Sequence, residues 1–244
     1  KILLSIIALA LIVAIVWSVA TYKKETPAPT PATPSEPEIV YYDNPIDFAS
    51  LYEANNDVIG YIKVDGTVID YPIYQAGLDK EDDFYLDHDA KKHKSVFGAI
   101  YIQRRNAKDF SDRNTVLYGH CMKNGSMFAA EHRFGNSKDF FEKNRNIMIY
   151  LPDRILTYTI YAVTITDDTH LLYKYDFNTP EGTSAFLDML QKPSGKHFVY
   201  DKLEVSDQNN FVTLSTCTAR EGERLLLVGV LTDLKHTKSA IPGF

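Results

Sequence analysis

Eight short apolar segments, separated by turn residues, most constrain the fold of this chain. They are rich in Val, Ile, Leu, Thr and Tyr, and most of these residue types favour strands. The Asp65-Gly66 pair between the first two segments is a hairpin signal. Many strands joined by short turns predict a mostly antiparallel barrel or rolled sheet. The expected strands are residues 60–64, 67–73, 96–103, 114–118, 146–151, 155–166, 211–215 and 224–233.

Fewer segments predict helices. The last of them has Thr179 as an N-cap and Pro180 at its first position, and Ser137 caps another. The polar segment 104–113 is predicted to be an exposed loop. The expected helices are residues 46–55, 126–134, 137–143 and 179–190.

The N-terminal part differs in composition from the rest. Residues 2–20 carry no charged side chain, and a helix there, at ~1.5 Å per residue, would match the ~30 Å core of a bilayer. Residues 21–38 hold regularly spaced prolines, which predict an extended spacer. We therefore expect a transmembrane anchor at 1–20, a Pro-rich linker at 21–38 and one folded domain at 39–244. A cleaved signal peptide and a buried core helix are the alternatives for the apolar segment.

The overall charge excludes some classes of function. The net charge of −6 argues against a nucleic-acid partner, because phosphate binding needs a basic face. No phosphate-binding glycine motif is present, and the acidic run 79–83 lacks the spacing of a calcium loop. We expect no metal and no cofactor.

The two cysteines, Cys121 and Cys217, are too few for a disulfide framework. Cys217 follows the strand at 211–215, His120 follows the strand at 114–118, and Arg224 begins the next strand. A thiolate attacks carbonyl groups, an imidazole moves the proton, and an arginine stabilises the negative charge on oxygen. These residues form a thiol acyl-transfer site if the three strands are neighbours. The alternative for Cys217 is a small buried filler.

Other residues compete for these roles. Arg220 is closer to Cys217 in sequence than Arg224 is, but it is expected in a mobile loop at 218–223. A lone histidine is more often structural or solvated than catalytic. We place His88 and His93 in a charged solvated stretch, His132 and His197 on helix and loop surfaces, and His170 and His236 outside any strand-end context.

Four motifs together suggest a family. They are Leu214-Ser215-Thr216-Cys217, Tyr118-Gly119-His120, Arg224 followed by Leu-Leu-Leu-Val, and the strand pair within 60–73. With these motifs in this order, the chain resembles a class B sortase from about residue 44 to residue 234. The resemblance implies a sortase-type β-barrel of about eight strands, with N-terminal helices and a helix between two late strands, behind a single transmembrane helix.

The resemblance also implies a reaction. A membrane-anchored cysteine transpeptidase of Gram-positive bacteria would cleave the C-terminal sorting motif of an exported protein after its threonine. The product would be a thioacyl-enzyme on Cys217, which a peptidoglycan precursor amine then attacks. His120 would act as acid and base, and Arg224 would hold the substrate carbonyl or the oxyanion.

The family places the catalytic domain on the extracellular face of the cell membrane, held by the N-terminal helix. The lysines flanking the apolar segment, Lys1 before it and Lys23 and Lys24 after it, mildly favour the opposite orientation. We follow the family for this prediction.

Two other functions fit the same residues. A thiol endopeptidase would use water as the acceptor, and a catalytically idle barrel would only bind surface ligands. One position departs from the family, because class B sortases commonly carry asparagine after the histidine and this chain has Cys121. Cys121 is either a small filler or a partner for an inactivating disulfide with Cys217.

Overall fold

The computed structural model describes residues 17, 39–192, 197–238 and 241. The predicted transmembrane anchor at 1–20, Trp17 apart, and the predicted linker at 21–38 lie outside the described residues. Within the described residues, no helix combines the length and the apolar character needed to cross a bilayer.

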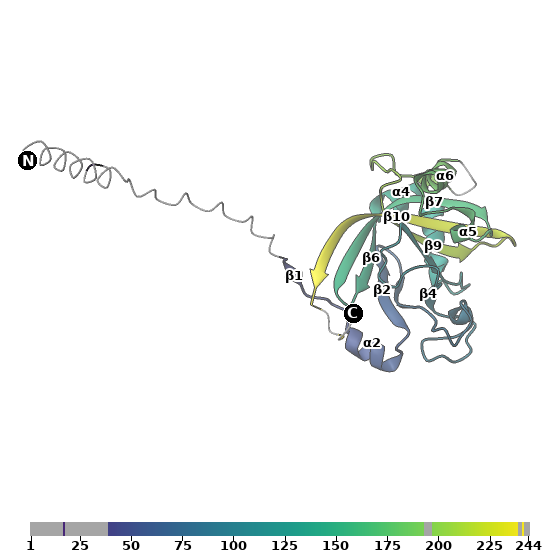
Figure 1. Ribbon diagram of the computed structural model, residues 1–244. Helices are drawn as coiled ribbons and strands as arrows, with labels where there is room; N and C mark the ends of the chain where they lie inside the picture. Colours follow the sequence, from purple (N-terminus) through teal and green to yellow (C-terminus); the bar gives the residue numbers. More distant parts are fainter. Residues whose placement is uncertain (1–16, 18–38, 193–196, 239–240, 242–244) are drawn as a thin grey trace, which may run out of the picture. The chain divides into compact units, whose positions relative to one another are not determined.

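Eight strands of the described chain close into a barrel, as the sequence predicts (Figure 1). Their order is β10-β9-β5-β4-β3-β2-β6-β7, and β7 pairs with β10 to close the ring. Two short strands pair alongside the barrel: β1 (Tyr41–Tyr42) pairs with β10, and β8 (Phe198–Val199) pairs with β7. The barrel strands are β2 (Val58–Val64), β3 (Asp70–Tyr74), β4 (Ile100–Ile102), β5 (Asn114–Tyr118), β6 (Asn146–Leu151), β7 (Arg154–Asp167), β9 (Phe211–Cys217) and β10 (Glu223–Thr237).

Strand lengths differ from the sequence prediction where tertiary contacts decide them. The strand expected at 96–103 is only β4, because Gly98 adopts φ 58° and turns the chain. A Cβ on Gly98 would lie 2.4 Å from the carbonyl oxygen of Leu86, so only glycine fits there. Strands β9 and β10 run further than expected because they pair with each other, and β10 also pairs with β7.

The predicted helices are present with shifted ends. The Asp47 carboxylate accepts a hydrogen bond from the Ser50 amide, so the first helix begins at Phe48 instead of residue 46. The helix expected at 126–134 is two shorter pieces, and α5 was not predicted because four residues show no periodicity. The helices are α2 (Phe48–Ala54), η1 (Phe84–Leu86), η2 (Phe128–Glu131), α3 (His132–Asn136), α4 (Lys138–Lys143), α5 (Leu171–Lys174) and α6 (Pro180–Leu190).

The loop at 104–113 is less exposed than predicted. Asn106 and Phe110 are buried within it. The Asn106 side chain accepts a hydrogen bond from the Val116 amide at 3.0 Å and donates one to the Asn114 carbonyl at 2.9 Å. The loop is therefore fixed to strand β5.

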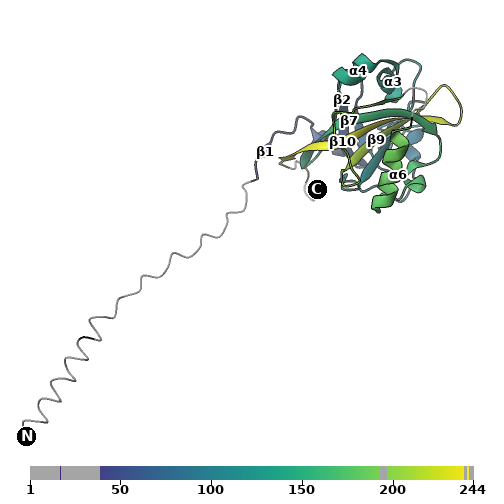
Figure 2. The same ribbon diagram turned by 90° about the horizontal axis from the view of Figure 1, so that it is seen from above.

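Two apolar cores lie on opposite faces of strands β5, β9 and β10. One takes residues such as Leu214 and Leu225 from all eight barrel strands, together with residues of η2, α3 and α4. The other joins Phe211 and Leu226 to residues of α5 and α6. Figure 2 shows α3 and α4 on one side of these strands and α6 on the other. Because successive strand residues point to opposite faces, every second residue of β9 and β10 faces the α5–α6 side.

Candidate active site

Strand pairing brings the three predicted site residues together. Cys217 is the last residue of β9, and Arg224 lies directly opposite it on antiparallel β10. Strand β5 runs parallel beside β9 with Tyr118 opposite Ser215, and His120 follows two residues later. The Thr216 hydroxyl donates to the Gly119 carbonyl at 2.8 Å, which keeps the chain beyond β5 against β9. The three strands are therefore neighbours, as the site requires.

These side chains share one face of the sheet. Cys217 and Phe211 are six residues apart on β9, and Arg224 and Leu226 are two apart on β10, so each pair points the same way. Phe211 and Leu226 belong to the core beneath α5 and α6. Cys217, His120 and Arg224 line a pocket of about 290 Å³ on this face, whose wall includes residues 166–171 between β7 and α5. Cys217 is exposed, so a carbonyl group can reach its sulfur.

The imidazole of His120 is held by a backbone carbonyl. Its Nε2 lies 2.8 Å from the oxygen of Leu86 in η1. A carbonyl only accepts hydrogen bonds, so Nε2 carries the hydrogen and Nδ1 is the ring nitrogen left for proton transfer. Gly98 lets the chain pass close to this carbonyl and so helps to place it.

Arg224, and not Arg220, is the arginine of the pocket. Arg224 is half-buried, donates to the Glu223 carbonyl at 3.1 Å and makes no ion pair within the described residues. Its guanidinium therefore keeps donors for a substrate oxygen. Arg220 is exposed in the loop after β9 and pairs with Glu223 at 3.5 Å.

His170 lies at no strand end, as the sequence indicates, yet the structure places it in the site. His170 precedes α5 and lines the same pocket, where its Nε2 lies near the Gln103 side-chain oxygen and 3.3 Å from the Tyr118 hydroxyl. Burial, and then the nearby Arg105 guanidinium, lowers the pKa of His170. A neutral imidazole in the pocket wall follows. No sequence pattern places His170 in the pocket, because the helix that follows it, α5, is too short to recognise.

The interpretation of His132 as a surface residue also missed a contact. Its Nε2 lies 3.1 Å from the carbonyl oxygen of Cys217 and, by the same argument, donates a hydrogen bond to it. His132 begins α3, far from β9 in sequence, so only the folded chain brings the two together. It is a positioning residue for the end of β9, which carries the exposed thiol.

Replacing His132 with phenylalanine is expected to slow acylation of Cys217 about two- to tenfold, the effect of losing one hydrogen bond. The change should fall on kcat, since His132 is absent from the pocket lining. Stopped-flow acylation with a sorting-motif peptide measures it. His132→Gln, which retains an N–H donor, should recover most of the rate. A His132→Phe variant that acylates at the wild-type rate would contradict the role.

Cys121 directly follows His120 in the chain. It forms an isolated antiparallel bridge with buried Met127, and no disulfide joins Cys121 to Cys217 in this structure. Cys121 is not among the residues that line the pocket with Cys217. The oxidative disulfide between them stays a hypothesis.

Comparison with known proteins fits this geometry. Residues 62–232 match the family model described as the sortase domain. Sortase B of Listeria monocytogenes is 32% identical over 188 residues, which cover 76% of this chain and 74% of that protein.

This chain belongs to the class B sortases.

Solved structures agree with the assignment. Clostridium perfringens sortase B superposes with a TM-score of 0.68 at 30% identity, covering 76% of this chain and all of that one (100%). A Staphylococcus aureus sortase B–substrate complex gives a TM-score of 0.66 at 26% identity, covering 76% and 84% of the two chains. The chain is a cysteine transpeptidase that cleaves a sorting motif and attaches the cleaved protein to the cell wall. The fold expected from the resemblance is confirmed for the described residues.

Proposed function

We propose that Cys217 is the nucleophile of this sortase, with His120 as the acid and base and Arg224 as the oxyanion donor. The observation that carries the proposal is the strand register: Arg224 lies opposite Cys217, and His120 follows the strand parallel to β9. His120, about a hundred residues before the other two, thereby opens into one pocket with Cys217 and Arg224.

The first half of the reaction forms a thioester. The Cys217 thiolate attacks the threonine carbonyl carbon of the sorting motif, and the carbonyl electrons move to oxygen. Arg224 donates hydrogen bonds to this oxyanion, and its guanidinium stays charged throughout. The C–N bond then breaks, and protonated His120 gives its proton to the departing amine through Nδ1. The motif residues after threonine leave, and the acyl group stays on sulfur.

The second half transfers the acyl group to an amine. Neutral His120 takes a proton from the incoming amine as its nitrogen attacks the thioester carbon. The C–S bond breaks, the thiolate of Cys217 is restored, and His120 ends protonated for the next cycle. The new amide bond replaces the one that was cleaved, so no external energy source is needed.

We propose that this chemistry takes place outside the cell, with the chain held at the membrane by the apolar segment 2–20. The substrates would then be exported proteins that carry a sorting motif, and the acceptor would be a peptidoglycan precursor amine. The apolar composition of 2–20 and the proline spacing of 21–38 support this arrangement.

Intact-protein mass spectrometry with a panel of sorting-motif peptides tests the proposal. We expect an adduct on the full-length chain equal to the peptide up to its threonine. Triglycine or a diaminopimelate peptide should discharge the adduct as an amide product. Discharge by water alone would favour the endopeptidase. No adduct with any NPxTx or LPxTG peptide would overturn the assignment of Cys217 as nucleophile.

A further inference from the structure

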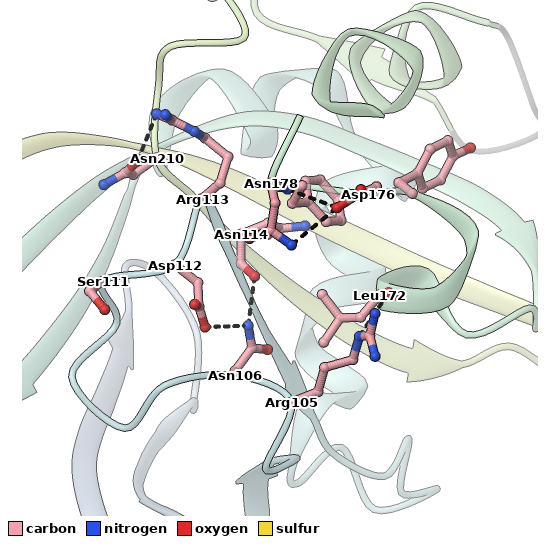
Figure 3. A pocket seen from close by; sticks show the side chains of 12 residues that line it. Arg105, Asn106, Ser111, Asp112, Arg113, Asn114, Leu172, Asp176, Asn178 and Asn210 are labelled. Atoms are coloured by element: carbon pink, nitrogen blue, oxygen red, sulfur yellow. Dashed lines mark hydrogen bonds between the residues drawn. The ribbon is translucent and has the colours of Figure 1, made fainter. Parts of the chain in front are cut away.

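A second pocket lies on the same face of the barrel as the active site, across α5. Its volume is about 500 Å³, within the ~300–1,000 Å³ of small-ligand sites. The walls come from the fixed loop and the start of β5 (residues 105–114), from residues 172–178 around α5, and from Asn210 before β9 (Figure 3). The described chain thus has a larger hollow here than at Cys217.

A buried polar group without a partner lines this pocket. Asn114 is 1% exposed, and its side-chain oxygen accepts a hydrogen bond from the Thr213 hydroxyl at 2.9 Å. Its side-chain nitrogen has no hydrogen-bond partner in the described part of the chain. If the oxygen and nitrogen of the Asn114 amide were exchanged, the oxygen would be the atom without a partner. Because a buried polar group without a partner costs free energy, a polar ligand at this position is expected to satisfy it.

Among the residues that the structure describes, two arginines of the pocket have no carboxylate partner. Arg105 donates its Nε to the Leu172 carbonyl at 3.0 Å and stacks on Tyr173, with no ion pair. Arg113 donates to the side chain of Asn210 at 3.0 Å and to the Gln208 carbonyl, also without an ion pair. Figure 3 shows Arg105 beside Leu172 and Arg113 beside Asn210, with Asn114 between them in this view. The pocket therefore offers positive charge to an anionic group.

Two carboxylates stand in the same pocket. One oxygen of Asp112 accepts from the Asn106 side chain at 2.9 Å, and one oxygen of Asp176 accepts from the Asn178 amide at 3.1 Å. The second oxygen of each carboxylate can accept an N–H from a ligand. A phosphate ion has few donors, its P–OH groups, and its negative charge would be repelled by both acids. A peptide with a free carboxylate supplies both the anion and the N–H groups.

We propose that this pocket binds the carboxylate-bearing peptide that carries the acceptor amine. The inference rests on the proposed transpeptidation, because it gives the pocket a role in the second half-reaction only. Asn114 is in register with Phe211 on β9, six residues before Cys217. At ~3.3 Å per residue, the two sites are about 20 Å apart along the strand. An extended branch of about six residues spans that distance, so one peptide can reach both.

The test separates the two half-reactions in the full-length chain. The main acceptor is a synthetic peptide with a five-residue stem, a free C-terminal carboxylate and triglycine on a lysine side chain. Two other acceptors serve for comparison: the same peptide with a C-terminal amide, and free triglycine. We expect the KM for the carboxylate peptide to rise about tenfold in Arg113→Gln and in Asn114→Leu, as for loss of one charge-assisted hydrogen bond. Acylation by the sorting peptide and transfer to triglycine should keep their wild-type rates.

The matched control is Arg133→Gln. Arg133 also donates to a backbone carbonyl, that of Gly66 at 2.7 Å, and stacks on an aromatic ring, but it lies outside the pocket. This variant should handle every acceptor as the wild type does. The wild type should have a KM for the amide peptide about tenfold above its KM for the carboxylate peptide. That increase should equal the one that the pocket variants show with the carboxylate peptide. Equal KM values for the carboxylate and the amide would overturn the inference.

Isothermal titration calorimetry measures peptide binding to the pocket directly, without relying on the proposed chemistry. The carboxylate peptide should bind the wild type at least about tenfold more tightly than it binds Arg113→Gln, whether or not the chain forms a thioester. Inorganic phosphate should bind neither protein measurably. Phosphate binding that depends on Arg113, with no binding of the peptide, would overturn the inference. A chain that binds the peptide but forms no adduct would sink the proposed function alone.

Discussion

Cys217→Ala is expected to abolish the acyl adduct and to lower transpeptidation by at least about 10⁴-fold. The thiol at the end of β9 supplies the nucleophile of the first half-reaction, and Cys217 is the only cysteine among the described residues that line the pocket. Since the side chain is exposed, its loss should change the free energy of unfolding by no more than about 0.5 kcal/mol. Single-turnover transfer from a sorting-motif peptide to triglycine, with thermal unfolding in parallel, measures both quantities.

Cys121→Ala is the matched control for this variant. It removes the other thiol, which does not line the pocket, and should leave acylation unchanged. After mild oxidation, a disulfide between the two cysteines would inactivate the wild type but not Cys121→Ala. Loss of the adduct in Cys121→Ala, with the adduct retained in Cys217→Ala, would reverse the assignment of the nucleophile.

Arg224→Gln is expected to lower kcat for acylation about 10²- to 10³-fold, as for loss of an oxyanion donor. In the proposed reaction the guanidinium charge stabilises the oxygen that becomes negative, so the effect should fall on kcat more than on KM. Arg224→Lys keeps the charge but loses the planar fork, and it should recover only part of the rate. Acylation progress curves over a range of peptide concentrations separate kcat from KM.

Arg220→Gln provides the comparison for the arginine. Arg220 is closer to Cys217 in sequence but lies in the exposed loop, paired with Glu223. Its substitution should change acylation less than twofold, because a surface ion pair contributes little. A larger loss in Arg220→Gln than in Arg224→Gln would mean that the loop closes over the substrate and supplies the working arginine.

The barrel was largely predictable because its signals are local. Alternating apolar strands and a hairpin turn are properties of neighbouring residues, and the caps at Ser137 and Thr179 act within one turn. The ends of strands were less predictable. Pairing with β7 as far as His236, and with β1 at Thr237, extends β10 beyond its predicted end, and the close approach of Gly98 to Leu86 shortens β4.

The sequence by itself determined which residues could run the chemistry: one cysteine, one histidine and one arginine, each beside a strand end. Only the tertiary structure decided that His120 and Cys217 follow parallel neighbouring strands and that Arg224 is in register with the thiol. It also placed His132 on the Cys217 carbonyl, His170 in the pocket wall and Asn114 in the second pocket. Apart from the register of Cys217 with Arg224, these contacts join residues tens of positions apart, and their energy depends on burial and strand register. Neither quantity exists until the barrel closes.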